Sequence, residues 1–335
     1  MAVGTKNRVA FGTTEGTFGT ATAITNAKSW PFTGDRPRIV DTKISDQDSL
    51  IGVYEVGREK VISALRTEAI FEFDFRVDCW AYWLYRALGT KVVSGVGPYV
   101  HTFTQNEADS DSFTIFWVDA NTTASKVEQF PGCKVKSLTL KGSAGGPLKI
   151  VVEIIGAGGH AEATNTMVAL NTSVINPFSN ISAANFGGSI TFTTDAMSVA
   201  SGTNILALTQ EFELKIENMY EEGNEYVAGQ TTMAALDRTG TKTSGRILEK
   251  WQENALVSGG FLDVVEKSTN KTLWLVLTNA THGAKIALAR CYYDDPSAPG
   301  GRNKLRKPLN FDALYDDTAA LAGKFEVTNA TASYS

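Results

Sequence analysis

The stretch FEFDFRVDCWAYWLYRALGT, Phe71–Thr90, joins two structural patterns and decides the fold class. Apolar and charged residues alternate over 71–78, as they do in a strand with one buried face. The apolar face comprises Phe71, Phe73, Phe75 and Val77, and the polar face comprises Glu72, Asp74, Arg76 and Asp78. We therefore predict a half-buried strand over this range.

The spacing then becomes helical. Large apolar residues recur every three or four positions after Cys79, and Gly89 stands where a left-handed cap would end a helix. These residues are Trp80, Trp83, Leu84, Ala87 and Leu88. A second segment, 246–260 (RILEKWQENALVSGG), ends at Gly259 and has the same spacing at Leu248, Trp251, Ala255 and Leu256. We predict two helices whose aromatic faces pack on sheets.

Strand patterns dominate the rest of the chain. In 211–218 (EFELKIEN), Phe212, Leu214 and Ile216 alternate with Glu211, Glu213, Lys215 and Glu217. Further strands are predicted over 113–118, 133–140, 148–155, 189–194, 272–278, 285–290 and 324–329. The chain is therefore predicted to be mainly β.

Bulk composition limits the classes of function. The 335 residues suffice for two domains, and 43% hydrophobic and 20% charged residues are ordinary for a globular protein. A net charge of −5 argues against a basic surface that binds nucleic acid without regard to sequence. The N-terminus has no signal-like apolar region and no apolar run could span a bilayer. Three widely spaced cysteines favour folding in a reducing cytoplasm.

A glycine cluster imitates a dinucleotide-binding loop. Gly156–Ala161 (GAGGHA) follows an apolar run and fits the phosphate-loop pattern. The next residues are rich in Thr and Asn rather than helix formers, and no acidic residue occurs between Glu162 and Asp195 to hold a ribose. We interpret the cluster as a strand followed by a flexible linker, and we predict no cofactor.

An internal repeat suggests duplication. Tyr54–Val61 (YEVGREKV) matches Tyr220–Val227 (YEEGNEYV) at an offset of 166, and each copy precedes a predicted helix, a tryptophan-bearing strand and two further strands. The predicted organisation is an extended N-terminal arm over 1–36, a first domain over 37–158 and a second over 159–335. The arm is rich in Gly and Thr, and we expect it to become ordered only on a neighbouring subunit.

The order of these segments resembles the duplicated major tail tube proteins of long-tailed, non-contractile bacteriophages. The likeness rests on FGTTEGTFGTATA, EAIFEFDFRVDCWAYWLYRALGT, FPGCKVKSLTLKGSAGGPLKIVVEIIGAGG, ALTQEFELKIENMYEEGNEYVAGQ and GKFEVTNATASYS, and it covers almost the whole chain. It implies two tandem β-sandwich or half-barrel domains, each flanked by one helix.

The resemblance also implies a structural role. Trimeric, pseudo-hexameric rings would stack into a virion tail tube that conducts DNA without binding it. The implied partners are other copies of the chain, a tape measure protein, and tail terminator and tip proteins. Assembly would take place in the host cytoplasm, without a membrane.

The sequence contains no recognisable metal-binding or catalytic motif. His101, His160 and His282 have no partner at metal spacing, and Asp109 and Asp111 lack the glycine and glutamate of a calcium loop. We therefore predict neither a metal site nor an enzyme. A basic loop that could contact a neighbouring subunit contains Arg302, Lys304, Arg306 and Lys307. A solvated loop or a DNA contact would also suit these residues.

The polar faces of the two clearest strands are the candidate channel lining. They carry six acids against two bases, a negative bias that would repel phosphate. The acids are Glu72, Asp74, Asp78, Glu211, Glu213 and Glu217. Alternatively, these strands belong to an outer sheet, where their acids only increase solubility. The alternative function for the whole chain is an extracellular β-sandwich module for binding or for a surface layer.

Overall fold

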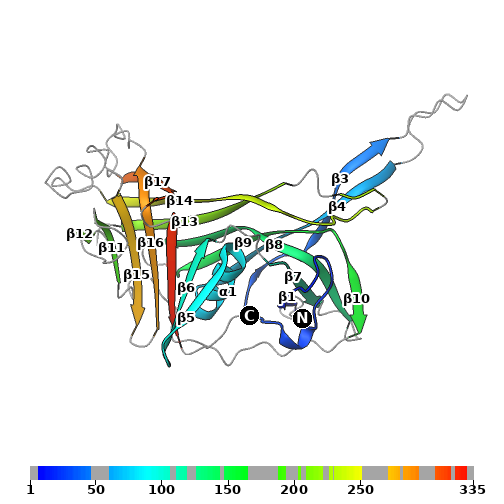
Figure 1. The fold of residues 1–335 in the computed structure, drawn as a ribbon, viewed down its shortest axis with the longest axis horizontal. Helices are drawn as coiled ribbons and strands as arrows, with labels where there is room; N and C mark the ends of the chain where they lie inside the picture. Colours follow the sequence, from blue (N-terminus) through cyan, green and yellow to red (C-terminus); the bar gives the residue numbers. More distant parts are fainter. Residues whose placement is uncertain are drawn as a thin grey trace, which may run out of the picture.

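The computed structural model describes residues 7–46, 60–105, 111–118, 126–143, 147–164, 188–193, 203–204, 209–221, 226–228, 230–250, 271–279, 282–293, 306–317 and 321–329. They contain one α-helix, and every pairing between their strands is antiparallel. The prediction of a mainly β fold is confirmed (Figure 1).

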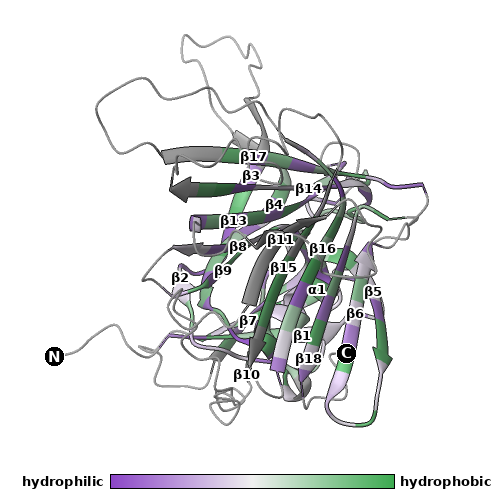
Figure 2. Cartoon of the chain, turned by 90° about the vertical axis from the view of Figure 1, so that its left-hand side faces the viewer, coloured by the Kyte–Doolittle hydropathy of each residue, from purple (hydrophilic) through white to green (hydrophobic). Residues whose placement is uncertain are grey.

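The described residues of the first half form ten strands and the α-helix. In chain order they are β1 (Arg8–Thr14), β2 (Thr33–Gly34), β3 (Arg38–Asp46), β4 (Lys60–Asp74), α1 (Val77–Leu88), β5 (Gly89–Ser94), β6 (Tyr99–Gln105), β7 (Phe113–Val118), β8 (Lys126–Ser143), β9 (Lys149–Gly156) and β10 (Ala161–Thr164). The second half holds β11 (Gly188–Thr193), β12 (Thr203–Asn204), β13 (Thr209–Tyr220), β14 (Arg238–Lys250), β15 (Lys271–Asn279), β16 (His282–Tyr293), β17 (Arg306–Leu314) and β18 (Gly323–Asn329). Hydrophobic and hydrophilic residues both occur along these strands (Figure 2).

The β4–α1 segment follows the sequence pattern closely. Phe71 and Phe73 are buried and Asp74 is exposed, as the alternation predicts. Gly89 adopts the left-handed conformation (φ 88°) and its N–H donates to the Tyr85 carbonyl, which ends α1. The predicted strand over 71–78 is wrong at its C-terminal end. Strand β4 ends at Asp74, and Asp78 lies in the first turn of α1.

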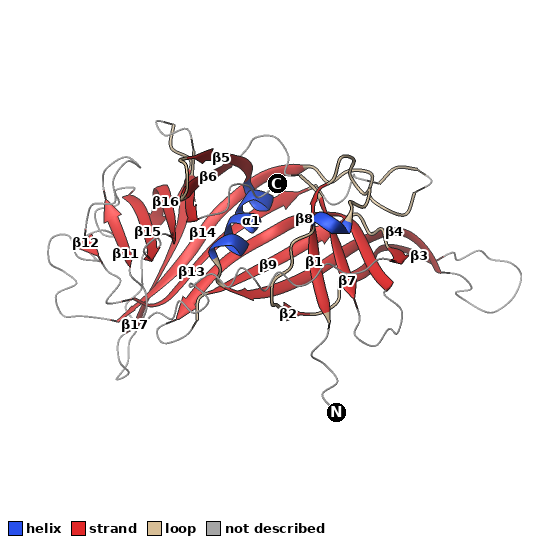
Figure 3. Cartoon of the chain, turned by 90° about the horizontal axis from the view of Figure 1, so that it is seen from below, coloured by secondary structure: helices blue, strands red, loops and turns tan. Residues whose placement is uncertain are grey.

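Eight strands form a continuous sheet in the order β3–β4–β9–β8–β13–β14–β17–β16, which we call the long sheet. One face of the long sheet is apolar, and α1 packs against β8 on that side (Figure 3). A single cluster of buried apolar side chains extends through both halves of the chain, from Val9 to Val327. The halves therefore share one core.

The same strand pairings occur in both halves. In the first half β4 pairs with β3 and β9, β8 pairs with β9, β7 and β10, and β7 pairs with β1. In the second half β14 pairs with β13 and β17, β16 pairs with β17, β15 and β18, and β15 pairs with β11. The seven second-half strands in this pattern follow one another along the chain in the same order as their seven first-half counterparts. Strands β2, β5, β6 and β12 lie outside the pattern.

The register matches at the level of single residues. A row of directly opposed residues crosses the first four strands of the long sheet, and a second row crosses the other four. The first row is Ile39, Thr67, Gly156 and Cys133, and the second is Ile216, Thr243, Ala313 and Cys291. Both cysteines are buried, and each thiol lies next to the carbonyl three residues earlier.

Two strand pairings join the halves: β6 with β18, and β8 with β13 within the long sheet. We call the pairing of β8 with β13, with Ser137–Ser143 opposite Glu211–Glu217, the internal junction. Asn218 is 2% exposed there, and its amide nitrogen donates to the carbonyls of Ala87 and Val135 at 2.9 Å each. The hydroxyl of Thr241 donates to the Asn218 side-chain oxygen. This side chain therefore connects α1, β8, β13 and β14.

The described part of 1–36 packs on its own chain, contrary to the expectation of an extended arm that is ordered only by a neighbouring subunit. Strand β1 pairs with β7 of the same chain, and Phe11 is fully buried against Trp83 and Phe113. The Glu15 carboxylate, 7% exposed, accepts hydrogen bonds from the Thr114 hydroxyl and the Gly132 N–H. Gly and Thr content misled the prediction because aromatic residues between the glycines supply the core contacts.

The glycine cluster is a buried corner rather than a flexible linker. The strand that precedes it is β9, as predicted, and β10 follows it in place of a helix. Gly158 has φ +83°, and a Cβ there would lie 2.5 Å from the Leu65 carbonyl oxygen. Only glycine fits such a close backbone approach, so the cluster serves packing.

Two more predictions need correction. Residues 246–250 of the predicted second helix belong to β14, and the part beyond them lies outside the described residues. Arg306 and Lys307 begin β17 opposite Lys250 and Glu249, so they are strand residues and not loop residues. Arg302 and Lys304 lie outside the described residues, as does Tyr54 of the sequence repeat.

Candidate functional site

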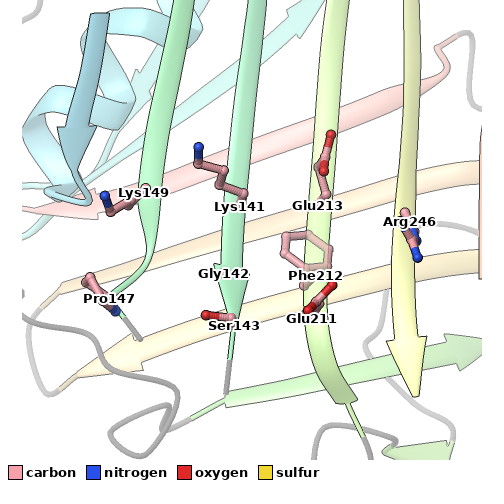
Figure 4. A pocket seen from close by; sticks show the side chains of 9 residues that line it. All are labelled: Lys141, Gly142, Ser143, Pro147, Lys149, Glu211, Phe212, Glu213 and Arg246. Atoms are coloured by element: carbon pink, nitrogen blue, oxygen red, sulfur yellow. The ribbon is translucent and has the colours of Figure 1, made fainter. Parts of the chain in front are cut away.

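The polar face of the long sheet gathers charged side chains from several strands into rows. One row runs from β4 to β17 through directly opposed residues: Asp74, Lys149, Lys141, Glu213, Arg246 and Asn310. Figure 4 shows Lys149, Lys141, Glu213 and Arg246 following one another across neighbouring strands. Acids from β4 and β13 thus meet bases from β8, β9 and β14.

Glu72 forms the centre of this arrangement. One carboxylate oxygen lies 2.8 Å from Lys141 Nζ, and the other accepts a hydrogen bond from Lys149 Nζ. These two lysines, Lys141 first, lower the pKa of Glu72 below its ordinary value. The same carboxylate raises the pKa of Lys149. The pairs are half-exposed, with 27% of the Glu72 side chain accessible.

The acids of β13 also have basic neighbours. Glu213 stands opposite Lys141 on one side and Arg246 on the other. Glu217 forms an ion pair with Lys215 at 3.2 Å and stands opposite Lys242, which pairs with Asp312 at 3.0 Å. The negative bias expected from two isolated strands is therefore offset, because the neighbouring strands supply bases that only the register brings into place.

Asp78 does not belong to this face. It is 8% exposed in the first turn of α1, and its carboxylate accepts a hydrogen bond from the Asn329 amide at 2.8 Å. The strand interpretation failed here because β4 ends at Asp74 and α1 begins at Val77, before the alternation in the sequence ends at Asp78. Glu72, Asp74, Glu211, Glu213 and Glu217 all lie on the polar face.

A pocket of about 270 Å³ lies at the middle of the row that runs from β4 to β17, lined by Lys149, Lys141, Glu213 and Arg246 among others. Side chains from β8, β9, β13 and β14 line it, together with Pro147 before β9. Its charged residues are Lys141, Lys149, Glu211, Glu213 and Arg246. The mixture of charges gives no set of ligands for a metal, and no group of three or more metal-binding side chains occurs in the part of the chain that the structure describes.

Two of the three histidines lie beside aromatic rings. His101 is buried beside Phe103, and His160 lies near Phe130 and 3.7 Å from Glu128. Burial raises the pKa of the Cys79 and Cys133 thiols, so both are protonated at neutral pH. Among the described residues, no helix is long and apolar enough to cross a membrane.

A β-rich subunit with open sheet edges and a broad charged face, but no chemical centre in its described part, is suited to assembly. A family described as phage tail tube protein matches residues 4–313, nearly the whole chain. The chain belongs to this family. Among curated proteins, a search finds no match.

Membership assigns this tail tube protein a structural role in the phage tail, in a tube built of its own subunits. The resemblance deduced from segment order is thus confirmed. Sequence reasoning missed Lys141, Lys149 and Arg246 as part of the charged face. Each lies on an alternating strand, but which acids it meets depends on register, and no local pattern encodes that.

Proposed function

We propose that three copies of this tail tube protein close into a ring, and that stacked rings enclose a channel through which DNA passes into the host cell. Each chain would contribute two tandem units, as predicted, with β1–β10 forming the first and β11–β18 the second. The boundaries differ from the predicted domains 37–158 and 159–335, because β1 pairs with β7 and β10 pairs with β8. The ring would then have pseudo-sixfold symmetry. The chain acts in the virion tail and has no catalytic role.

The repeated pairing pattern carries this proposal. The matched rows that begin at Ile39 and Ile216 support descent of the two halves from one duplicated unit. The internal junction then serves as a template for the contact between subunits, with β3 of one copy taking the place that β13 has within the chain. A head-to-tail contact that repeats this rotation closes into a ring and leaves no open strand edge.

The matched isoleucines differ in burial as the proposal requires. Ile216 is 1% exposed because β8 lies beside β13, whereas Ile39 is 38% exposed at the outer edge of β3. Apolar residues on an open strand edge favour pairing with another chain. Ring closure would bury Ile39 as Ile216 is already buried.

The polar face of the long sheet would line the channel, since the apolar face carries α1 and the core. Its offset charges suit a wall that must let phosphates pass without holding them. We propose that the acids of β4 and β13 face the channel. We also propose that the basic residues Arg302, Lys304, Arg306 and Lys307 contact a neighbouring subunit. Tape measure, terminator and tip proteins would meet the tube inside and at its ends.

Mass measurement and electron microscopy of assembled protein test the proposal. We expect hollow tubes whose rings contain three chains, and rings of six full-length chains would contradict it. The Ile39→Asp variant should remain folded and fail to assemble because a charge would be buried at the contact. Val40→Asp, which adds the same charge on the polar face of the same strand, is the matched control and should assemble.

A further inference from the structure

We propose that Glu72 keeps the channel wall from binding DNA by holding Lys141 and Lys149 in ion pairs. This inference rests on the proposed function, since it places the polar face of the long sheet toward the DNA. It assigns Glu72 a role of its own on this face, because its carboxylate pairs with two lysines at once.

The register places two lysines side by side, and Glu72 forms an ion pair with each of them. Lys141 and Lys149 stand directly opposite each other on β8 and β9. Like charges in such a position repel, and two adjacent ammonium groups form the kind of basic site that binds phosphate. Both lysines are partly exposed, at 43% and 38%, so a phosphate could reach them.

The carboxylate of Glu72 contacts both lysines, one with each oxygen. Among the described residues, Glu72 is the one acid within ion-pair distance of either lysine. Asp74 and Glu213 flank the lysines in the row but form no ion pair with them within 4 Å. The shift of Glu72 to a lower pKa agrees with a carboxylate that stays charged between two ammonium groups.

Removal of the Glu72 charge should therefore expose a basic pair on every subunit around the channel. Two lysines free to contact phosphate make DNA binding weaken about tenfold between roughly 50 and 200 mM salt. A structural brace between β4, β9 and β8 would also be lost, but that loss by itself creates no affinity for DNA.

The test uses tubes assembled from the full chain and a short fluorescent DNA duplex, whose retention is measured at low and moderate salt. Wild-type tubes should retain little DNA, and Glu72→Gln tubes should retain it in a salt-dependent way. Asp74→Asn removes the same charge from the same strand and face and should behave as wild type.

A triple variant separates charge control from bracing. Glu72→Gln combined with Lys141→Gln and Lys149→Gln lacks both ion pairs and also lacks the basic pair, so its DNA retention should return to the wild-type level. Equal retention by the triple and single variants would overturn the inference, as would Glu72→Gln tubes that retain no DNA at low salt.

Two further outcomes remain distinguishable. If wild-type protein forms no hollow tube, the proposed function fails before the inference is reached. If Glu72→Gln does not assemble, Glu72→Asp takes its place, since its shorter carboxylate cannot reach both lysines. Glu72→Asp tubes should then retain more DNA than wild-type tubes at low salt. Retention equal to that of wild type would contradict the inference.

Discussion

Ile216 and Ile39 occupy matching positions in two strands that have opposite surroundings. Each stands opposite a buried threonine, Thr243 for Ile216 and Thr67 for Ile39. The internal junction covers Ile216 with β8, while the outer edge of β3 leaves Ile39 open. The difference teaches what the proposed ring would change, since the internal junction is the model for the contact that β3 would make with a neighbouring copy.

The largest effect is expected at the completed contact. Ile216→Asp places a carboxyl among buried apolar side chains and removes packing, so we expect a loss of at least about 4 kcal/mol in the free energy of unfolding. Urea unfolding of the free subunit, followed by tryptophan fluorescence, measures it. Unfolding at the wild-type midpoint would show that the junction does not support the fold.

Asn218 sharpens the comparison through hydrogen bonds. Asn218→Ala leaves the buried carbonyls of Ala87 and Val135 without their donor, which should cost about 1–3 kcal/mol. Asp41 is its counterpart by register on β3 and is exposed. Asp41→Ala should leave the same unfolding curve almost unchanged, and equal losses at both positions would break the comparison.

A smaller effect concerns the ion pairs beside the junction. Because the folded pKa of Glu72 lies below its ordinary value of 4.5, its stabilisation is present above that pH and is lost as the pH falls through the folded pKa. Partial exposure limits it to about 1 kcal/mol or less. Glu72→Gln should flatten the acid limb of a stability–pH curve, whereas Asp74→Asn should not.

The smallest change in stability is expected at the open edge. Ile39→Asp should shift the free energy of unfolding of the free subunit by no more than about 0.5 kcal/mol, since the side chain is already partly in water. The same urea experiment checks it beside Ile216→Asp. A loss as large as that of Ile216→Asp would mean that β3 is not an open edge.

Some features of this protein follow from its sequence by itself. Strict alternation in β4 and β13 defines their buried faces, and helical spacing followed by Gly89 defines α1 and its end. These predictions succeed because local periodicity reports which side of an element meets the core. The order of such elements along the chain was enough to indicate a tail tube protein.

Only the tertiary structure determined which side chains from distant parts of the chain are in contact. The N-terminal segment belongs to the core because Phe11 packs against Trp83 and Phe113. Asp78 is buried, and its carboxylate accepts a hydrogen bond from the Asn329 amide. Lys141 and Lys149 become partners of Glu72 through register between strands far apart in sequence. Pairing between distant strands depends on the packing of the whole sheet, so no local stretch of sequence specifies it.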